Sequence, residues 1–346
     1  MQMKKLLLIF VLLHFSVAHA VVDTNLYSGE VVVPSQSLAD RNEAIPDALI
    51  QVLQKLSGQR EMPFSPALDE ALGNAVKLLL SFRYQNVERT GPDGVMTSEL
   101  QLVAQFMQAE VDRVITQTGL PRWQQERPAV EIWVVIDDGN KRELKPLEFE
   151  YAWESLQDIA KMRGLPVSWP ELDEEEIQLV DMRLIWGGFT DYLVERGAPA
   201  DGVAIIAARR EGPEWTLRWN LAIGEQHWSW RSSDQELMFA LAQGVHTMTD
   251  HVSAINTIAA SEQGVSSVAV TVGELNNAED YADCLEYLQS LSIVTAVEIL
   301  GADPGRVHFQ LQLNATPEYL SEAFSRGSVL LPANSGSEFD YEFLHK

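Results

Sequence analysis

Blocks of apolar and polar residues along the chain predict short strands that alternate with amphipathic helices. Leu26 to Val33 form the first block, an apolar run that indicates a strand. Ser37 is placed to cap the helix that follows and Gly58 to end it, whereas Pro46 predicts either a kink or a later start. The apolar residues of this helix recur with helical period at Leu38, Ile45, Leu49, Val52, Leu53 and Leu56.

Three further blocks complete an N-terminal α+β domain, which we place at residues 21–120. Residues 65–84 predict a second helix, residues 86–106 predict two strands around a Gly-Pro-Asp-Gly turn, and residues 107–120 predict a third helix. The next segment, PRWQQERP at residues 121–128, is polar and bounded by prolines. This composition predicts a linker.

The middle of the chain predicts a second α+β domain, which we place at residues 129–260. Gly164 is expected to end a helix, and Gly212 and Gly224 are expected to lie in turns between strands. The predicted elements are a strand at 129–137, a helix at 151–163, a helical stretch at 184–197, three strands within 200–232 and a long helix at 234–259.

The C-terminal domain is expected over residues 264–332 in the order β-α-β-β-α-β, which is the plan of ferredoxin-like folds. Its central strands form a hairpin around Asp303, Pro304 and Gly305. Residues 333–346 are polar and acidic for most of their length and predict a loose tail. The expected fold class is therefore α+β, built from several small modules.

Residues 1–20, MQMKKLLLIFVLLHFSVAHA, have the pattern of a cleaved export signal. Lys4 and Lys5 precede an apolar core, and the final AHA has the small-x-small spacing that signal peptidase requires. We expect cleavage after Ala20 and a periplasmic location, with a retained N-terminal anchor as the alternative. No later stretch has about 18 uninterrupted apolar residues, so no stable membrane span is expected after cleavage.

The net charge of −25 restricts the classes of partner. Nucleic acid and anionic lipid both favour a basic protein surface, so neither is expected. The acidity is typical of a highly soluble protein, and a basic protein partner is the alternative interpretation. Cys284 is the single cysteine, so no internal disulfide can form, and its place in a predicted helix indicates a buried structural thiol.

Sequence patterns for catalysis, metal binding and cofactor binding are weak. The acids at residues 173–176 lack the spacing of a calcium loop and fit a helix N-terminus better. His246 and His251 are five positions apart, which directs them away from each other on a helix and argues against a zinc site. Glycine-rich nucleotide loops and serine-nucleophile motifs do not occur. We therefore expect no cofactor, no metal and no catalytic residue.

Tryptophan is concentrated in the strands of the middle domain. Trp215 and Trp219 share one side of a strand, as do Trp228 and Trp230, because strand side chains repeat every two residues. Such rows pack well across strands inside a core, and this is the favoured interpretation. They also suit a surface that binds a partner or a sugar. These four residues are the candidate partner or ligand surface.

Arg41, near the start of the first helix, suggests either an anion site or a part of the scaffold. An anion site at a helix entrance usually needs a glycine-rich loop, and the segment PSQSLAD contains no glycine. We therefore expect Arg41 to hold the helix entrance against the sheet, through backbone carbonyls or a carboxylate.

The segment VPSQSLADRNEAIPDALIQVLQKLSG resembles the start of a Gram-negative bacterial family of unknown function, domain of unknown function 2066. More weakly, it is similar to N-terminal modules of envelope assembly proteins, such as a flagellar ring-assembly factor and the curli secretion lipoprotein. That family has no established activity, so the resemblance transfers no catalytic residue. The residues that carry the resemblance are Arg41, Ala44, Ala48, Leu49, Val52, Leu53, Leu56, Ser57 and Gly58.

These observations favour a non-catalytic periplasmic protein, an adaptor or assembly factor that binds another component of the cell envelope. Two alternatives stay open: a periplasmic small-ligand or glycan-binding protein that uses the tryptophan rows, and a hydrolase with a dispersed site. A glycan site would place the tryptophans along a cleft, and a hydrolase would place a serine or aspartate beside a histidine. The sequence does not define an oligomeric state.

Overall fold

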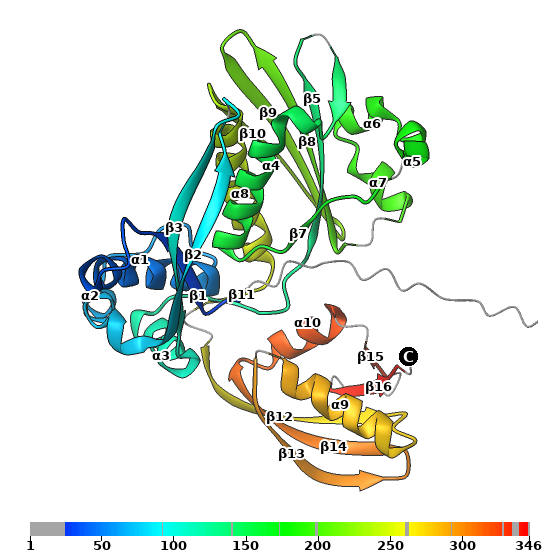
Figure 1. The fold of residues 1–346 in the computed structure, drawn as a ribbon. Helices are drawn as coiled ribbons and strands as arrows, with labels where there is room; N and C mark the ends of the chain where they lie inside the picture. The colour runs from blue at the N-terminus through cyan, green and yellow to red at the C-terminus, as the bar shows by residue number, and fades with distance from the viewer. Residues whose placement is uncertain are drawn as a thin grey trace, which may run out of the picture.

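The computed structural model describes residues 25–344, apart from residues 92, 140, 173, 198–199, 260–262, 292, 327–328 and 334–338. In chain order it contains a three-stranded, a six-stranded and a five-stranded sheet, each with its own helices (Figure 1). The predicted α+β class is confirmed. The export signal expected at residues 1–20 lies outside the described residues. Within them, no helix is both long enough and apolar enough to cross a membrane.

The N-terminal unit is an antiparallel sheet with helices packed on one face. Its elements are β1 (Ser28–Val32), α1 (Leu38–Ser57), α2 (Pro66–Gly73), β2 (Leu79–Thr90), β3 (Met96–Phe106) and α3 (Gln108–Thr118). The strand order is β1-β3-β2. As expected, the Ser37 hydroxyl accepts a hydrogen bond from the Asp40 amide at the start of α1, and Gly58 ends the helix with φ +70°. The helix continues through Pro46.

The prediction of a helix over residues 65–84 is wrong beyond Gly73, where α2 ends. A short 3-10 turn spans Ala75–Leu78, and the chain then pairs with β3 from Leu79 to Thr90. Residues such as Leu79, Leu80 and Phe82 suit either structure by themselves. Pairing with β3 decides between them, and short-range periodicity does not contain that information.

The middle unit is a sheet of order β10-β9-β8-β5-β6, with β7 beside β5 and helices on both faces. Helices α4 and α8 cover one face, and α6 and α7 cover the other, with α5 beside them (Figure 1). A left-handed Gly188, with φ +80°, separates α6 from α7, so the helical stretch predicted at 184–197 is two helices. The elements are β5 (Val130–Asp137), β6 (Arg142–Leu144), α4 (Glu150–Arg163), β7 (Val167–Ser168), α5 (Glu174–Leu179), α6 (Met182–Gly187), α7 (Thr190–Glu195), β8 (Gly202–Glu211), β9 (Glu214–Ile223), β10 (Gln226–Asp234) and α8 (Leu237–Ile255).

The C-terminal unit has one strand more than the expected plan. Its elements are β12 (Gln263–Gly273), α9 (Ala278–Ser290), β13 (Val294–Asp303), β14 (Arg306–Ala315), α10 (Glu318–Arg326), β15 (Leu330–Pro332) and β16 (Asp340–Phe343). The sheet order is β13-β14-β12-β16-β15. In a ferredoxin-like plan the last strand lies beside the first strand, here β12. In this structure β16 takes that position, and β15 pairs with the outer edge of β16.

The expectation of a loose tail is therefore wrong for residues 340–343. Tyr341 and Phe343 alternate with polar neighbours, and both side chains are buried in the C-terminal core. The acidic composition of residues 333–346 concealed this short alternating pattern. A strand of this length forms because β12 and β15 pair with its two edges.

The linker expected at residues 121–128 is a buried joint. Its strand β4 (Arg122–Trp123) pairs with β11 (Thr257–Ile258), which follows α8. Trp123, Gln124 and Arg127 are all buried. Trp123 and Arg127 find hydrogen-bond partners in distant parts of the chain, which the local composition does not reveal.

Arg41 holds α1 against the sheet, but through an aromatic ring. Its guanidinium lies over the ring of Phe82 in β2, 4.7 Å from the centroid, and donates to the Asn42 side chain. A cation above an aromatic face is attracted by the quadrupole of the ring. The carbonyl or carboxylate partner that we expected is thus replaced by Phe82.

We predict that Arg41→Ala lowers the free energy of unfolding by about 0.5–1 kcal/mol, the size of a partly exposed cation–π contact. Urea unfolding of the mature chain measures it. Arg41→Lys, which keeps the charge, should recover part of the loss. A Phe82→Leu background provides the control, because Arg41→Ala should then have little further effect. Equal losses in both backgrounds would contradict the pairing.

Candidate functional site

The four tryptophans of the candidate surface lie on one side of β9 and β10, facing α8. Trp215 and Trp219 are buried in the core, and the Trp219 indole donates to the Ser232 hydroxyl at 2.9 Å. Trp230 lies directly across from Trp219 in the neighbouring strand, and their rings stack at 5.5 Å. Trp215 and Trp219 therefore present no surface to a partner.

Trp228 and Trp230 are half-buried at the margin of the same core. The ring of His251, from α8, stacks on Trp228 at 5.5 Å and lies 5.3 Å from Trp230. Burial lowers the pKa of His251, and Asp250 opposes that shift. The aromatic rings thus pack against one another and against this imidazole, so they do not form an exposed row.

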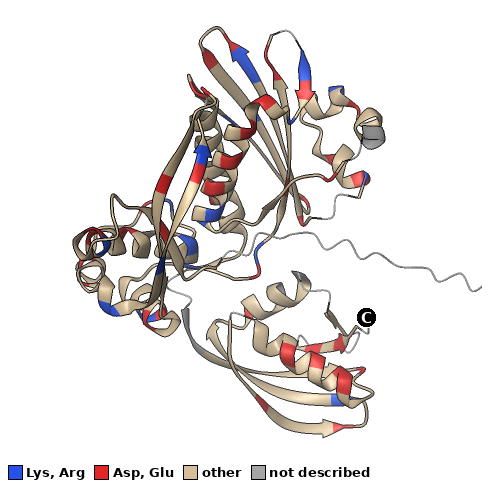
Figure 2. Cartoon of the chain, in the orientation of Figure 1, with Lys and Arg blue, Asp and Glu red and all other residues tan. Residues whose placement is uncertain are grey.

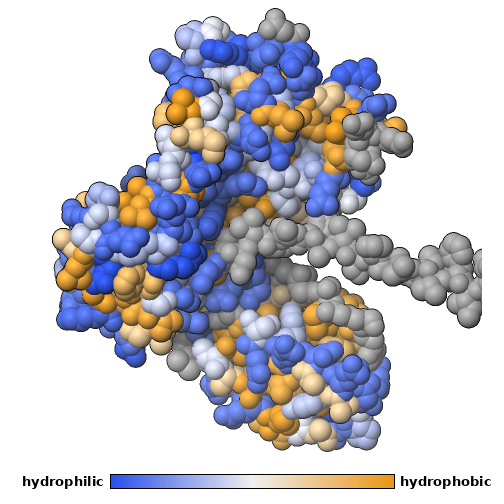
Figure 3. Space-filling view, in the orientation of Figure 1, coloured by the Kyte–Doolittle hydropathy of each residue, from blue (hydrophilic) through white to orange (hydrophobic). Residues whose placement is uncertain are grey.

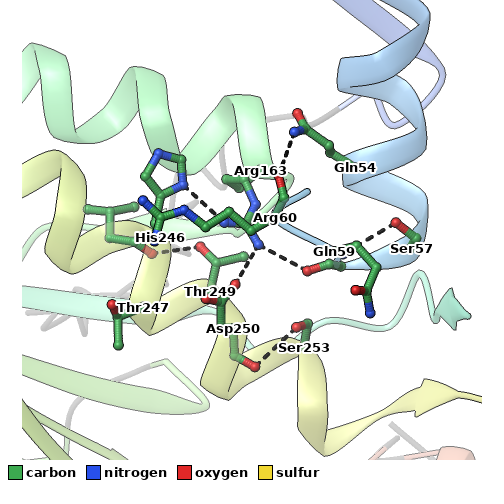
Figure 4. Close-up of polar contacts among 12 residues, drawn as sticks. Gln54, Ser57, Gln59, Arg60, Arg163, His246, Thr247, Thr249, Asp250 and Ser253 are labelled. Carbon is green, nitrogen blue, oxygen red and sulfur yellow. Dashed lines mark hydrogen bonds and ion pairs between the residues drawn. The ribbon is translucent and has the colours of Figure 1, made fainter. Parts of the chain in front are cut away.

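A buried arginine joins the C-terminal ends of α1 and α4 (Figure 4). Arg163, the last residue of α4, donates to the Gly58 carbonyl at 2.9 Å and to Asp250 at 2.7 Å. Its second terminal nitrogen lies 3.0 Å from Nδ1 of His246. Because arginine only donates, Nδ1 must accept, and the imidazole proton then lies on Nε2.

A second arginine, Arg127 of the joint, completes this contact. It donates to the carbonyls of Gly164 at 2.6 Å and Lys55 at 2.7 Å, which lie at the ends of α4 and α1. Its guanidinium lies 3.8 Å from the centroid of Trp123. Burial lowers the pKa of Arg127, yet a guanidinium stays protonated at neutral pH. The last carbonyls of a helix carry partial negative charge, which stabilises both cations.

Hydroxyl, imidazole and carboxylate groups gather here without forming a catalytic relay. Thr249 donates to the Val245 carbonyl and Ser253 to the Asp250 carbonyl, so neither hydroxyl is held by His246. Burial, then the charges of Arg163 and Arg60, lower the pKa of His246 to about 4. The imidazole is neutral at physiological pH and serves as a hydrogen-bond acceptor.

Cysteine and metal chemistry receive no support from the described residues. Cys284 is fully buried, and burial raises the pKa of its thiol to about 12, far from the thiolate form that reacts. Among the residues that the structure describes, no three His, Cys, Asp or Glu side chains are grouped so that they would hold a metal ion.

An apolar surface that sequence analysis missed lies over α5, α6 and α7. We call it the α5–α7 surface and define it by four exposed side chains, Ile177, Leu179, Phe189 and Val194, whose exposed fractions are 46, 72, 59 and 56%. Apolar residues gather beside α6 and α7 in the space-filling view (Figure 3). Exposed large apolar side chains in one short segment are typical of an interaction site.

Two arginines lie over the ring of Trp186 in α6, the helix between α5 and α7 in the chain. Arg142 and Arg209 both lie over the ring of Trp186, 4.4 and 5.2 Å from its centroid, and both also contact Asp137. The residues come from β6, β8 and α6, which are far apart in the sequence. The segment IWGGF at 185–189 was the local sequence signal for this surface, because two aromatic residues flank a glycine pair in a short helical stretch.

A family model matches the N-terminal part of the chain. Residues 20–124 match a family described as Domain of unknown function (DUF8605). No curated protein matches the chain. Among solved structures, the N-terminal domain of Protein Y from Thermus thermophilus is similar over 22% of this chain and 87% of its own length, with 14% identity and a TM-score of 0.16.

The resemblance to domain of unknown function 2066 is therefore wrong. The opening segment on which we based it, residues 33–58, lies inside the region that matches DUF8605, a different domain of unknown function. Unrelated families share the pattern of a capped helix with small and apolar residues on one face. The pattern therefore predicts a helix but does not identify a family.

We predict that Arg127→Met destabilises the protein strongly. The change leaves the carbonyls of Lys55 and Gly164 without these donors, and an unsatisfied buried polar group costs about 1–3 kcal/mol. Urea unfolding measures the loss. Arg113→Met is the matched control, because Arg113 is largely exposed and its ion pair with Glu110 contributes about 0.5 kcal/mol or less. Equal losses in the two variants would contradict the role of Arg127.

We predict that His246 makes the protein sensitive to acid. Its folded pKa, about 4, lies below the ordinary 6.5, so the unfolded chain binds a proton in this window that the folded chain excludes. Stability that is present above about pH 6.5 is thus lost as the pH falls towards 4. His246→Gln should flatten this part of the profile of melting temperature against pH, and His227→Gln, at an exposed site, should not. Parallel profiles for wild type and His246→Gln would contradict this assignment.

Proposed function

We propose that this is a non-catalytic periplasmic protein, an adaptor or assembly factor that binds another protein of the cell envelope through the α5–α7 surface. The observation that carries the proposal is the exposure of Leu179 and Phe189, with Ile177 and Val194, within the short segment that contains α5, α6 and α7. Large apolar side chains are costly to leave in water, and burial against a partner removes that cost.

The groups around the surface support a protein partner. Protein interfaces are enriched in aromatic residues and arginine, and here Trp186 and Tyr192 both have guanidinium groups over their rings. The stacking holds Arg142 and Arg209 in place before a partner arrives, so less side-chain entropy is lost on binding. Asp137 pairs with both arginines, and Glu211 lies 3.9 Å from Arg209, so two carboxylates balance the two cations and we expect the partner to present an apolar surface.

The location follows from the export signal expected at residues 1–20. A cleaved signal delivers the chain to the periplasm, where the proteins and sugars of the envelope are its neighbours. The net charge of −25 keeps the exported chain soluble while the α5–α7 surface is uncovered. Site-specific contact with one envelope protein is therefore the property to test.

Photo-cross-linking in living cells tests the proposal directly. A photoreactive phenylalanine analogue replaces Phe189 in one strain and Phe64, which is fully exposed in the N-terminal unit, in a control strain. We expect one adduct of discrete mass in the periplasmic fraction from position 189 and none from position 64. Leu179→Asp should reduce that adduct about tenfold or more without lowering the melting temperature, because Leu179 is mostly exposed. Identical adducts from both positions, or none from position 189, would refute the proposal.

A further inference from the structure

A cleft of about 540 Å³ lies between the sheet of the N-terminal unit and α4 of the middle unit. The hairpin of β2 and β3 forms one wall, with Thr97 and Gln101, and α4 forms the other, with Tyr151 and Ser155. The hairpin runs alongside α4 (Figure 1), and charged residues occur on both (Figure 2). This volume falls within the ~300–1,000 Å³ of small-molecule sites.

Most charged side chains of the two walls pair with one another, and the exposed Glu154 of α4 adds one further carboxylate to the lining. Arg89 of β2 pairs with Asp158 of α4, and its Nε lies 3.3 Å from Glu99 of β3. Lys161 of α4 reaches Glu30 of β1, with 2.7 Å between Nζ and Oε1. The Arg89–Asp158 and Lys161–Glu30 pairs cross from one unit to the other, so they also hold the two walls of the cleft together.

The third cation of the cleft is committed to the protein as well. Lys55 of α1 is 3% exposed, and its ammonium group donates to the Ser28 carbonyl at 2.7 Å. Burial lowers the pKa of Lys55 to about 8, and the nearby Glu30 opposes that shift. A second hollow of about 310 Å³ shares Glu30, Lys55 and Lys161 with the cleft and continues along the polar face of the sheet.

Apolar side chains occupy part of the lining. Ile159 and Met162 of α4, Met238 of α8 and the ring of Tyr151 all line the cleft. The lining therefore combines a ring and aliphatic carbon with charged donors and acceptors that are mostly paired, and it has one carboxylate more than it has cations. An anion has no unpaired cation to meet there, and the net charge of −25 repels it from the whole molecule.

We infer that this cleft is a binding site for a neutral, polyhydroxylated small molecule, a mono- or disaccharide. Hydroxyl groups both donate and accept, and so they suit a lining of paired carboxylate and guanidinium groups, amides and hydroxyls. The apolar face of a sugar ring suits the ring of Tyr151 and the methionines. The site is separate from the α5–α7 surface, which covers the opposite face of the middle sheet.

Titration calorimetry on the mature chain tests this inference with maltose, chitobiose and methyl glucoside as probes. Glucose 6-phosphate and spermidine are the charged comparators. Ser155→Trp fills the cleft from α4, and Gln157→Trp is the matched control on the same helix, outside the cleft lining. Thr97→Trp fills it from the opposite wall, so the test does not depend on the folding of one variant.

We expect at least one neutral sugar to bind wild type and Gln157→Trp saturably, and Ser155→Trp or Thr97→Trp to weaken it by about tenfold or more. The cross-link at position 189 should be unchanged in both cleft variants, which separates this site from the proposed function. Absence of saturable binding by all three sugars would overturn the inference. Sugar binding that both cleft variants leave intact, or binding of a charged comparator alone, would also overturn it.

Discussion

Two helices that end at the same place impose the constraint on which the rest of this structure depends. The last carbonyls of α1 and α4 have no partner within their own helices and carry partial negative charge. Arg163, the last residue of α4, donates to the Gly58 carbonyl at the end of α1. Arg127 donates to one carbonyl at the end of each helix, those of Gly164 and Lys55. Arginine suits this position because its rigid fork reaches two carbonyls at once, which the single ammonium of a lysine does less well. Burying two guanidinium groups is costly, so these contacts persist only while both helices stay in register.

The joint at residues 121–128 extends this constraint to the end of the middle unit. Trp123 lies under Arg127 and donates from its indole to the Asn256 side chain at 2.7 Å. Asn256 in turn donates to the Glu126 carbonyl, and β4 pairs with β11 at the same point. The chain thus enters and leaves the middle unit through one hydrogen-bonded junction. The walls of the cleft are held by this junction at one end and by the Arg89 and Lys161 ion pairs along their length.

Features that depend on a few neighbouring residues were predictable from the sequence. Ser37 and Gly58 bound α1 as expected, and Gly164 ends α4, because caps and left-handed glycines act within one helical turn. Leu79 and Tyr341 show where this approach fails, since each becomes part of a strand through pairing with a distant partner. The role of Arg127 was hidden for the same reason.

The candidate surface shows a different limit, because a strand pattern tells which residues share a side but not what covers that side. The four tryptophans do share one side, and α8 covers it. A better signal lay in β5 and β8, whose nearly continuous apolar sequences, VEIWVVID and GVAIIAARRE, are typical of parallel strands buried on both faces. One face of β5, with Ile132 and Val134, meets α4 and α8, and the other, with Trp133 and Val135, meets the segment at 177–195. Two short helices, α6 and α7, cover the second face with few residues, so the segment at 177–195 cannot bury all its apolar side chains. The side chains left outside are those of the α5–α7 surface, which makes that surface a consequence of how the middle sheet is covered.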